Sequence, residues 1–285
     1  CLAGSLLSGH DPVLVWVRPG RLWPGLAVDV RAWWAGWPFA ATLLAILGAH
    51  EAGHVWAARR HRIAVTPPFF IPFPPYLSVV GTLGAFIRVR APMLQRRPLL
   101  DVGLAGPLAG LVPSLVAAAW GLARSAPWPA TAGDPGAAYV VVFQGLEVGL
   151  GGSWLMDTLA AWLGPGPGPI RLHPVACAGW FGFFVTALNL LPLGQLDGGH
   201  IAYGALGAGH RGVAAAAVAA LAALGFAWAG WWVWAALVLA VNRGRPVHPP
   251  VFDPEAGVGA GRRWAAGLAG LLLAATFVPR PIVVP

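Results

Sequence analysis

Long runs of apolar residues, separated by clusters of arginine, are the feature that most constrains how this chain can fold. The runs lie at 34–58, 98–123, 173–191, 212–241 and 263–279. A helix of about 20 apolar residues is long enough to cross the hydrocarbon layer of a membrane. Only 10% of the residues are charged, whereas about 25% are charged in an ordinary soluble domain. The sequence therefore predicts an all-α polytopic membrane protein.

The arrangement of the basic residues predicts how the chain sits in that membrane. The net charge is +8 and the chain contains no lysine. The arginines lie in turns beside the apolar runs, as in Arg59-Arg60-His61-Arg62, and such clusters mark the cytoplasmic side. Nucleic acid is not expected as a partner, because no basic face is interleaved with aromatic residues. We expect an integral, multi-pass protein of a bacterial cell membrane.

A metal-ligand pattern, His50-Glu51-x-x-His54, lies inside the first apolar run. Residues four apart share one face of a helix, so both imidazoles can reach the same metal ion. Zinc lowers the pKa of a bound water to about 7, and Glu51 is placed to hold that water as a general base. Ionisable side chains at membrane depth are costly unless they have partners. The pattern therefore predicts one zinc ion per chain.

A catalytic zinc site takes three protein ligands, so one more must come from elsewhere in the chain. Asp101 and Asp197 are the other acids within the apolar segments, and both begin on the side where His54 lies. Asp101 follows Pro98 closely and fits a helix N-cap. Asp197 lies in a Gly-rich break whose flexible backbone can turn a carboxylate inward. We prefer Asp197, with Asp101 or His200 as the alternative ligand.

Residues 66–90 are predicted to be a re-entrant β segment beside this site. The part at 66–80, TPPFFIPFPPYLSVV, contains too many prolines for a regular helix, and GTLGAFIRVR at 81–90 predicts a short strand or hairpin. Irregular backbone at membrane depth must be buried or line a cavity.

Asn189 is a polar residue within the apolar run at 173–191. It either packs helices together or donates to a substrate carbonyl, and the residues alone favour neither reading.

The remaining segments are less specific. Residues 124–171 read as a loop with an amphipathic helix near 152–163. Residues 212–241 are interrupted by GFAWAGWW and form either one tilted helix or two short ones. The glycines at 103, 106 and 110 are spaced for close helix packing.

Four motifs together resemble the site-2 protease family of intramembrane zinc metalloproteases. They are HEAGH at 50–54, GTLGAFIRVRAP at 81–92, GLAGPLAG at 103–110 and TALNLLPLGQLDGGH at 186–200. The resemblance implies a core of three transmembrane helices, with His50, His54 and Asp197 as zinc ligands and Glu51 as the general base.

The resemblance also implies how substrate is held. Asn189 matches an asparagine associated with substrate positioning, and Gly81 and Gly84 lie in the β region that would hold an extended substrate strand. Many bacterial members carry a PDZ domain between the second and third core helices, where this chain has only 124–171. The chain is therefore similar to the PDZ-less branch, which has bacterial and chloroplast homologues.

These observations predict the organisation and the function of the chain. We expect the tail of a truncated span and an interfacial loop at 1–33, an intramembrane metalloprotease core at 34–205, and C-terminal transmembrane helices at 206–285. The predicted function is hydrolysis of peptide bonds in membrane-spanning substrates, with the active site toward the cytoplasmic side. The alternative is a non-proteolytic membrane binding protein with a structural metal site. Glu51 favours the enzyme, because a structural site needs no adjacent base.

Overall fold

The computed structural model describes most of the chain and is mainly helical. The residues described are 13–16, 25–28, 34, 36–67, 69–72, 82–86, 95–129, 136–143, 146–254 and 257–283. The α-helices are α3 (Trp37–Arg60), α4 (Arg96–Leu122), α5 (Trp154–Leu163), α6 (Pro174–Leu190), α7 (Asp197–Leu206), α8 (His210–Leu224), α9 (Gly230–Val241) and α10 (Ala260–Thr276). A 3-10 turn, η2 (Gly207–Gly209), joins α7 to α8.

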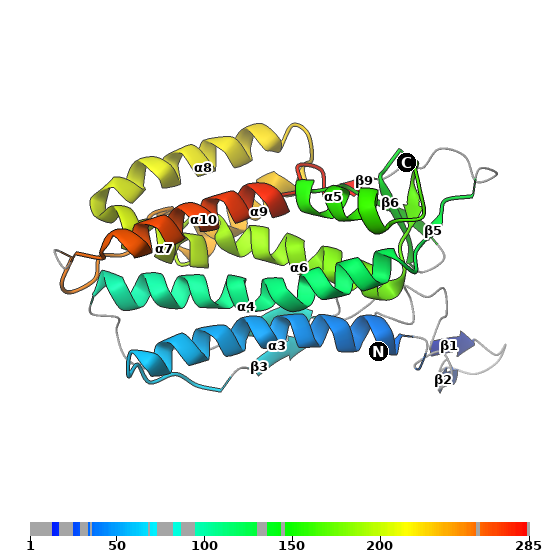
Figure 1. Ribbon diagram of the computed structural model, residues 1–285, viewed down its shortest axis with the longest axis horizontal. Coiled ribbons are helices and arrows are strands. Elements are labelled where there is room, and N and C mark those ends of the chain that lie inside the picture. Colours follow the sequence, from blue (N-terminus) through cyan, green and yellow to red (C-terminus); the bar gives the residue numbers. More distant parts are fainter. Residues whose placement is uncertain are drawn as a thin grey trace.

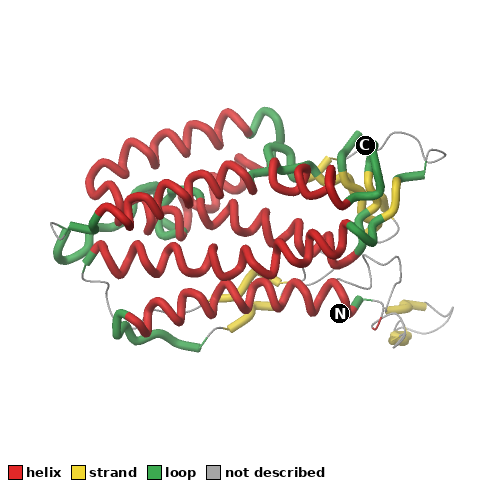
Figure 2. Tube along the Cα trace, viewed as in Figure 1, coloured by secondary structure: helices red, strands yellow, loops and turns green. Residues whose placement is uncertain are grey.

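Short strands form three small sheets. The strands are β1 (Val13–Trp16), β2 (Gly25–Val28), β3 (Phe69–Pro72), β4 (Thr82–Phe86), β5 (Ala126–Pro127), β6 (Tyr139–Phe143), β7 (Leu146–Leu150), β8 (Ile170–Arg171) and β9 (Ile282–Val283). β1 pairs with β2 and β3 with β4, both antiparallel, while the third sheet has the order β5-β8-β6-β7-β9. Figure 2 shows the third sheet at one end of the helices and the β3–β4 pair alongside α3.

Three helices, α3, α4 and α6, pack pairwise against one another, with α4 between α3 and α6 in Figure 1. Their apolar side chains meet in one cluster that includes Phe39 and Leu43 of α3, Leu122 of α4 and Phe183 of α6. Pro38 and Pro174 lie in the first turns of α3 and α6, where proline has a suitable φ and its missing N–H costs nothing. The three helices therefore provide a rigid scaffold for residues on their facing sides.

The helices agree with the predicted apolar runs to within a few residues. The stretch at 212–241, for which one or two helices were considered, forms two: α8 and α9 pack together, and the Trp232 indole N–H donates to the Ala222 carbonyl at 2.9 Å. Among the described residues, the helical stretches Arg96–Leu122 and Asp197–Leu224 are long and apolar enough to cross a membrane. Length and composition alone do not establish a polytopic membrane protein.

The prediction of a purely helical fold with one β segment is wrong in two places. The interfacial loop expected within 1–33 contains the β1–β2 pair, and the loop expected at 124–171 holds four strands of the third sheet. The amphipathic helix expected near 152–163 is confirmed as α5. β9, near the end of the chain, completes that sheet by pairing with β7. The β-branched run Val140-Val141-Val142 was a local signal for β6, which forms a hairpin with the adjacent β7 and also pairs with the more distant β8. The strand expected within 81–90 is confirmed as β4.

Candidate functional site

The predicted metal-ligand pattern lies in the middle of α3 and faces the interior. His50, Glu51 and His54 are all buried, with 6–7% of each residue exposed. The helix continues without interruption from Trp37 to Arg60, so the two histidines, one turn apart, point the same way. Their Nε2 atoms are 3.0 Å apart. One face of α3 thus presents two imidazole nitrogens to a single point.

Asp197 brings a carboxylate to the same point from the other side of the core. It is the first residue of α7, which follows a turn containing Pro192 and Gly194, the latter at φ 50°. Its Oδ2 lies 3.3 Å from His50 Nε2 and 3.4 Å from His54 Nε2. Asp197 therefore does not lie in a flexible break, as expected, but at the start of a helix directly after the break.

The triangle formed by these three atoms fits a zinc ion. Two ligands held tetrahedrally at the usual zinc distances of about 2.0–2.1 Å lie about 3.3 Å apart. The observed separations, 3.0, 3.3 and 3.4 Å, are close to that value on every side. Among the described residues, His50, His54 and Asp197 are the group of three that could hold a metal ion. Two imidazoles and one carboxylate are also a donor set that zinc accepts.

α4 fixes the orientation of both histidines. The Nδ1–H of His54 donates to the Val102 carbonyl at 2.9 Å, which leaves Nε2 unprotonated and available to a metal. Gly106 lies against the His54 ring and Gly110 against His50, each so close that a side chain at the glycine would press on the histidine. The sequence indicated that these glycines pack closely, but it did not show that they pack on the ligand rings.

Two predicted substrate-binding positions can be located, and one cannot. Asn189 lies near the end of α6, with its Nδ2 3.5 Å from His50 Nε2, so its amide borders the metal triangle. Gly84 lies within β4, which contacts α3. Gly81 lies outside the described residues. The roles of all three in binding substrate stay predictions.

Asp101, the alternative ligand, is engaged elsewhere. Its two carboxylate oxygens accept from Arg262 of α10 at 2.8 Å each, and one of them is also 2.8 Å from His61 Nε2. The helix begins at Arg96, so Asp101 lies in the second turn of α4 and the predicted N-cap is wrong. This ion pair joins the end of α3, the start of α4 and the start of α10. No local pattern predicts this ion pair, because Arg262 is distant from Asp101 along the chain.

His200, the other alternative, belongs to a separate aromatic cluster with Tyr203, His210 and His248. The Tyr203 and His248 rings stack at 4.9 Å, His200 meets His248 at 4.9 Å, and the His248 backbone N–H donates to His210 Nε2. Burial, and then the neighbouring His200, lowers the pKa of His248 to about 4. The cluster attaches the segment 242–254 to α7, the helix that begins with Asp197.

Comparison with known proteins agrees with this geometry. Residues 38–229 match peptidase family M50. The chain is 35% identical over 171 residues to "Probable zinc metalloprotease EGY1, chloroplastic" of Oryza sativa subsp. japonica, covering 60% of this chain and 28% of that protein. It is 34% identical over 174 residues to the protein of the same name in Arabidopsis thaliana, covering 61% and 30%.

A further relative has a similar match. "Probable zinc metalloprotease EGY2, chloroplastic" of Arabidopsis thaliana is 33% identical over 172 residues, covering 60% of this chain and 29% of that protein. The chain thus aligns with less than a third of the length of these relatives. No solved structure gives a significant match.

Proposed function

The chain belongs to peptidase family M50, and from that membership we propose that it is a zinc-dependent endopeptidase that cuts peptide bonds of membrane-spanning substrates. The observation that carries the proposal is the buried triangle of His50, His54 and Asp197 with Glu51 beside it. A structural zinc site is closed by four protein ligands, whereas a catalytic site has three and an open position. The three ligands lie next to the Glu51 carboxylate, which is not one of them, and this arrangement fits a catalytic site.

The three ligands and their supports have separate roles in this proposal. Zinc, when bound by the triangle, is a Lewis acid that lowers the pKa of a water at its open position to about 7. His50 and His54 offer neutral imidazole nitrogens, and Asp197 supplies a negative charge. The Val102 carbonyl keeps the proton of His54 on Nδ1, which holds the other nitrogen ready.

Glu51 and Asn189 act on the substrate side. The Glu51 carboxylate accepts a proton from the attacking water and then passes it to the nitrogen of the leaving amine. The Asn189 amide, 3.5 Å from His50 Nε2, is placed to donate to the oxygen of the scissile carbonyl. β4, which contains Gly84, contacts α3, so we infer that an extended substrate adds as a strand there. Gly81 is predicted to belong to the same substrate-binding segment. A transmembrane helix must be opened before its backbone can be cut.

The distribution of arginines supports a membrane location with the site toward the cytoplasm. α3 ends at the same end of the molecule where α4 and α10 begin (Figure 1). These termini carry Arg59, Arg60, Arg96, Arg97, Arg262 and Arg263. Positive residues at helix ends favour the cytoplasmic side. We therefore propose a multi-pass protein, in a bacterial cell membrane, whose partners are lipid and a membrane-protein substrate.

The decisive experiment combines metal content with cleavage. Wild type and Glu51→Gln are purified in detergent, their zinc is measured by elemental analysis, and both are incubated with a single-span reporter substrate. We expect about one zinc per chain in both proteins, and a loss of cleavage of about 10²–10⁴-fold in the variant. Full cleavage by Glu51→Gln would refute its role as the base.

The ligand set has its own test. Asp197→Ala removes one corner of the triangle, so its zinc content should fall well below that of wild type. Unchanged zinc would move the third ligand to another residue. A wild type that holds zinc but cuts none of a panel of membrane-spanning reporters would favour a structural metal site.

A further inference from the structure

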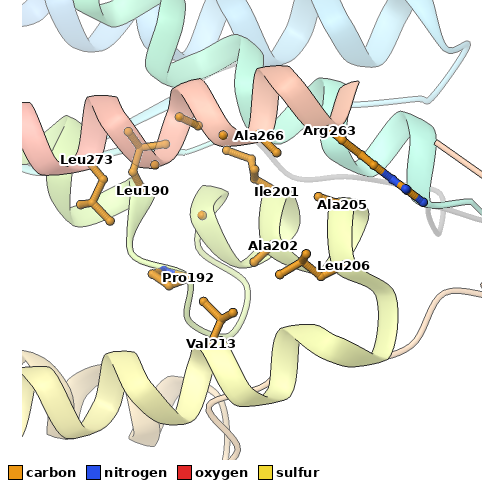
Figure 3. A pocket seen from close by; sticks show the side chains of 14 residues that line it. Leu190, Pro192, Ile201, Ala202, Ala205, Leu206, Val213, Arg263, Ala266 and Leu273 are labelled. Atoms are coloured by element: carbon orange, nitrogen blue, oxygen red, sulfur yellow. The ribbon is translucent and has the colours of Figure 1, made fainter. Parts of the chain in front are cut away.

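A large apolar groove lies between α10 on one side and α7 and α8 on the other (Figure 3). Its volume is about 670 Å³, within the range of small-molecule pockets. The walls are aliphatic or glycine, with Ile201, Ala202 and Leu206 on α7, Val213 on α8, and Ala266 and Leu273 on α10. The groove is thus suited to a hydrocarbon ligand.

Small residues on the facing helices keep the groove open. Gly267 and Gly270 line it from α10, and a side chain added at either would meet nothing within 4 Å. In membranes, glycine faces ordinarily allow two helix backbones to pack closely. Here Gly267 and Gly270 leave empty space beside them, whereas the space beside Gly106 is filled by the His54 ring. The groove therefore has room for a molecule that is not part of the described chain.

The polar character of the groove is confined to one end. Among the described residues that line it, Arg263 is the only ionisable one, and Figure 3 shows its side chain extending from α10 beside Ala205. Arg263 also lines a second hollow of about 420 Å³, formed by the turn at 257–260 and by Trp264. Trp264 is 78% exposed, as is common for tryptophan at the level of lipid headgroups. The apolar groove thus leads at one end to the guanidinium of Arg263, which lies next to Trp264 in the chain.

We propose that this groove binds one anionic phospholipid, with its phosphate at Arg263 and an acyl chain along α10 and α7. The proposal rests on the membrane location proposed above. A phospholipid matches the groove in charge and in polarity. Its phosphate is attracted by Arg263, and its acyl chain packs against the apolar walls. A transmembrane helix fits less well. A helix is about 10 Å wide, so 670 Å³ would enclose only about one and a half of its turns.

The groove adjoins the metal triangle, which gives lipid binding a consequence. Three residues of the groove lie close to Asp197 in the chain: Leu190 at the end of α6, Pro192 in the turn before Asp197, and Gly198 directly after it. An acyl chain in the groove packs against these three residues. Occupancy by lipid therefore stabilises the position of the Asp197 carboxylate, and its loss should increase the rate at which zinc is removed by a chelator.

The test counts bound lipid directly by native mass spectrometry. Wild type in detergent is titrated with phosphatidylglycerol or phosphatidylcholine, and we expect one tightly held phosphatidylglycerol. Arg263→Gln should weaken its binding about fivefold, the effect of one basic residue at an anionic lipid surface. Gly267→Leu fills the groove and should displace the lipid altogether. Arg211→Gln and Gly212→Leu, both at exposed positions of α8 outside the groove, are the matched controls.

The outcomes separate this proposal from the proposed function. Equal binding of the two lipids, or binding unchanged in Arg263→Gln, would overturn the anionic site. Lipid retained in Gly267→Leu would place the lipid elsewhere. If Gly267→Leu instead abolished crosslinking to a single-span peptide while keeping its lipid, the groove would be a peptide site. Zinc content and the effect of Glu51→Gln are measured independently of all these results.

Discussion

Substituting Gly106 by alanine should damage the metal site without touching any ligand. A Cβ at this position would lie 2.6 Å from Cδ2 of His54 and closer still to Cε1 and Nε2, whereas ordinary contact begins at 3.4 Å. The ring must therefore retreat by at least 0.8 Å, or α3 and α4 must separate. Metal sites tolerate errors of about 0.2 Å in ligand distance. The displacement is about four times larger than the site can absorb.

Alanine substitutions at Gly110 and Gly48 complete a series in which the steric conflict with the histidines decreases. At Gly110 an added Cβ would lie 3.1 Å from His50 Cβ, a deficit of 0.3 Å, and at Gly48 it would meet nothing within 4 Å. Helix propensity alone would stabilise all three alanine variants by about 0.5–1 kcal/mol. Overpacking opposes that gain at Gly106 by about 1–3 kcal/mol. Differences between the variants therefore report packing against the histidines.

The assay is zinc affinity, measured by competition with a chelator, together with the thermal midpoint. We expect Gly106→Ala to lose zinc affinity by on the order of 10–100-fold, as when the supports of a metal ligand are disturbed. Gly110→Ala should lose less, and Gly48→Ala nothing. The reasoning is refuted if Gly106→Ala binds zinc as tightly as Gly48→Ala, because the spacing of α3 and α4 would then not control His54.

Three further predictions concern stability and topology. Asp101→Asn weakens the bonds to Arg262 and His61, so we expect the free energy of unfolding to fall by about 1–2 kcal/mol with zinc content unchanged. Thermal melts check this against Asp253→Asn, which alters only an exposed contact to Gln95, and equal melting of the two variants would contradict it. Zinc at a hundred times its Kd should stabilise the folded protein by about 2.7 kcal/mol, and a shift that persists in Asp197→Ala would argue against the triangle. Cysteines introduced by Arg60→Cys and Phe252→Cys should react with impermeant maleimide from the cytoplasmic side and by Trp162→Cys from the other, all three positions being exposed. Labelling of all three from one side would rule out the proposed topology.

Much of the helical core could be predicted from the sequence because the relevant signals are local. An apolar run of sufficient length specifies a helix whatever lies around it, and α3, α4 and α6 follow their runs closely. The spacing of His50 and His54 on one helical face is equally local. Asp197 was preferred over Asp101 because of its Gly-rich surroundings, and the structure brings its carboxylate within 3.4 Å of both histidines.

Several of the features that were missed depend on residues distant in sequence, whereas the β1–β2 and β6–β7 pairs are formed by neighbouring strands. β9 pairs with β7, and Arg262 of α10 pairs with Asp101 of α4. Neither contact produces a periodic pattern in the sequence. Each strand or side chain could pair with many others until the helices are docked. The same applies to the groove beside α10, which forms between α10 on one side and α7 and α8 on the other only when these helices are docked.

The sequence by itself thus determined where this chain is helical and which helix carries the paired imidazoles, since apolar length and the 3.6-residue period act within one segment. Only the tertiary structure decided the closure of the metal triangle, the tautomer of His54 and the contact of Gly106 with its ring. These depend on distances of a few tenths of an ångström between separate helices. Close packing of whole side chains sets such distances, and no single segment contains that information.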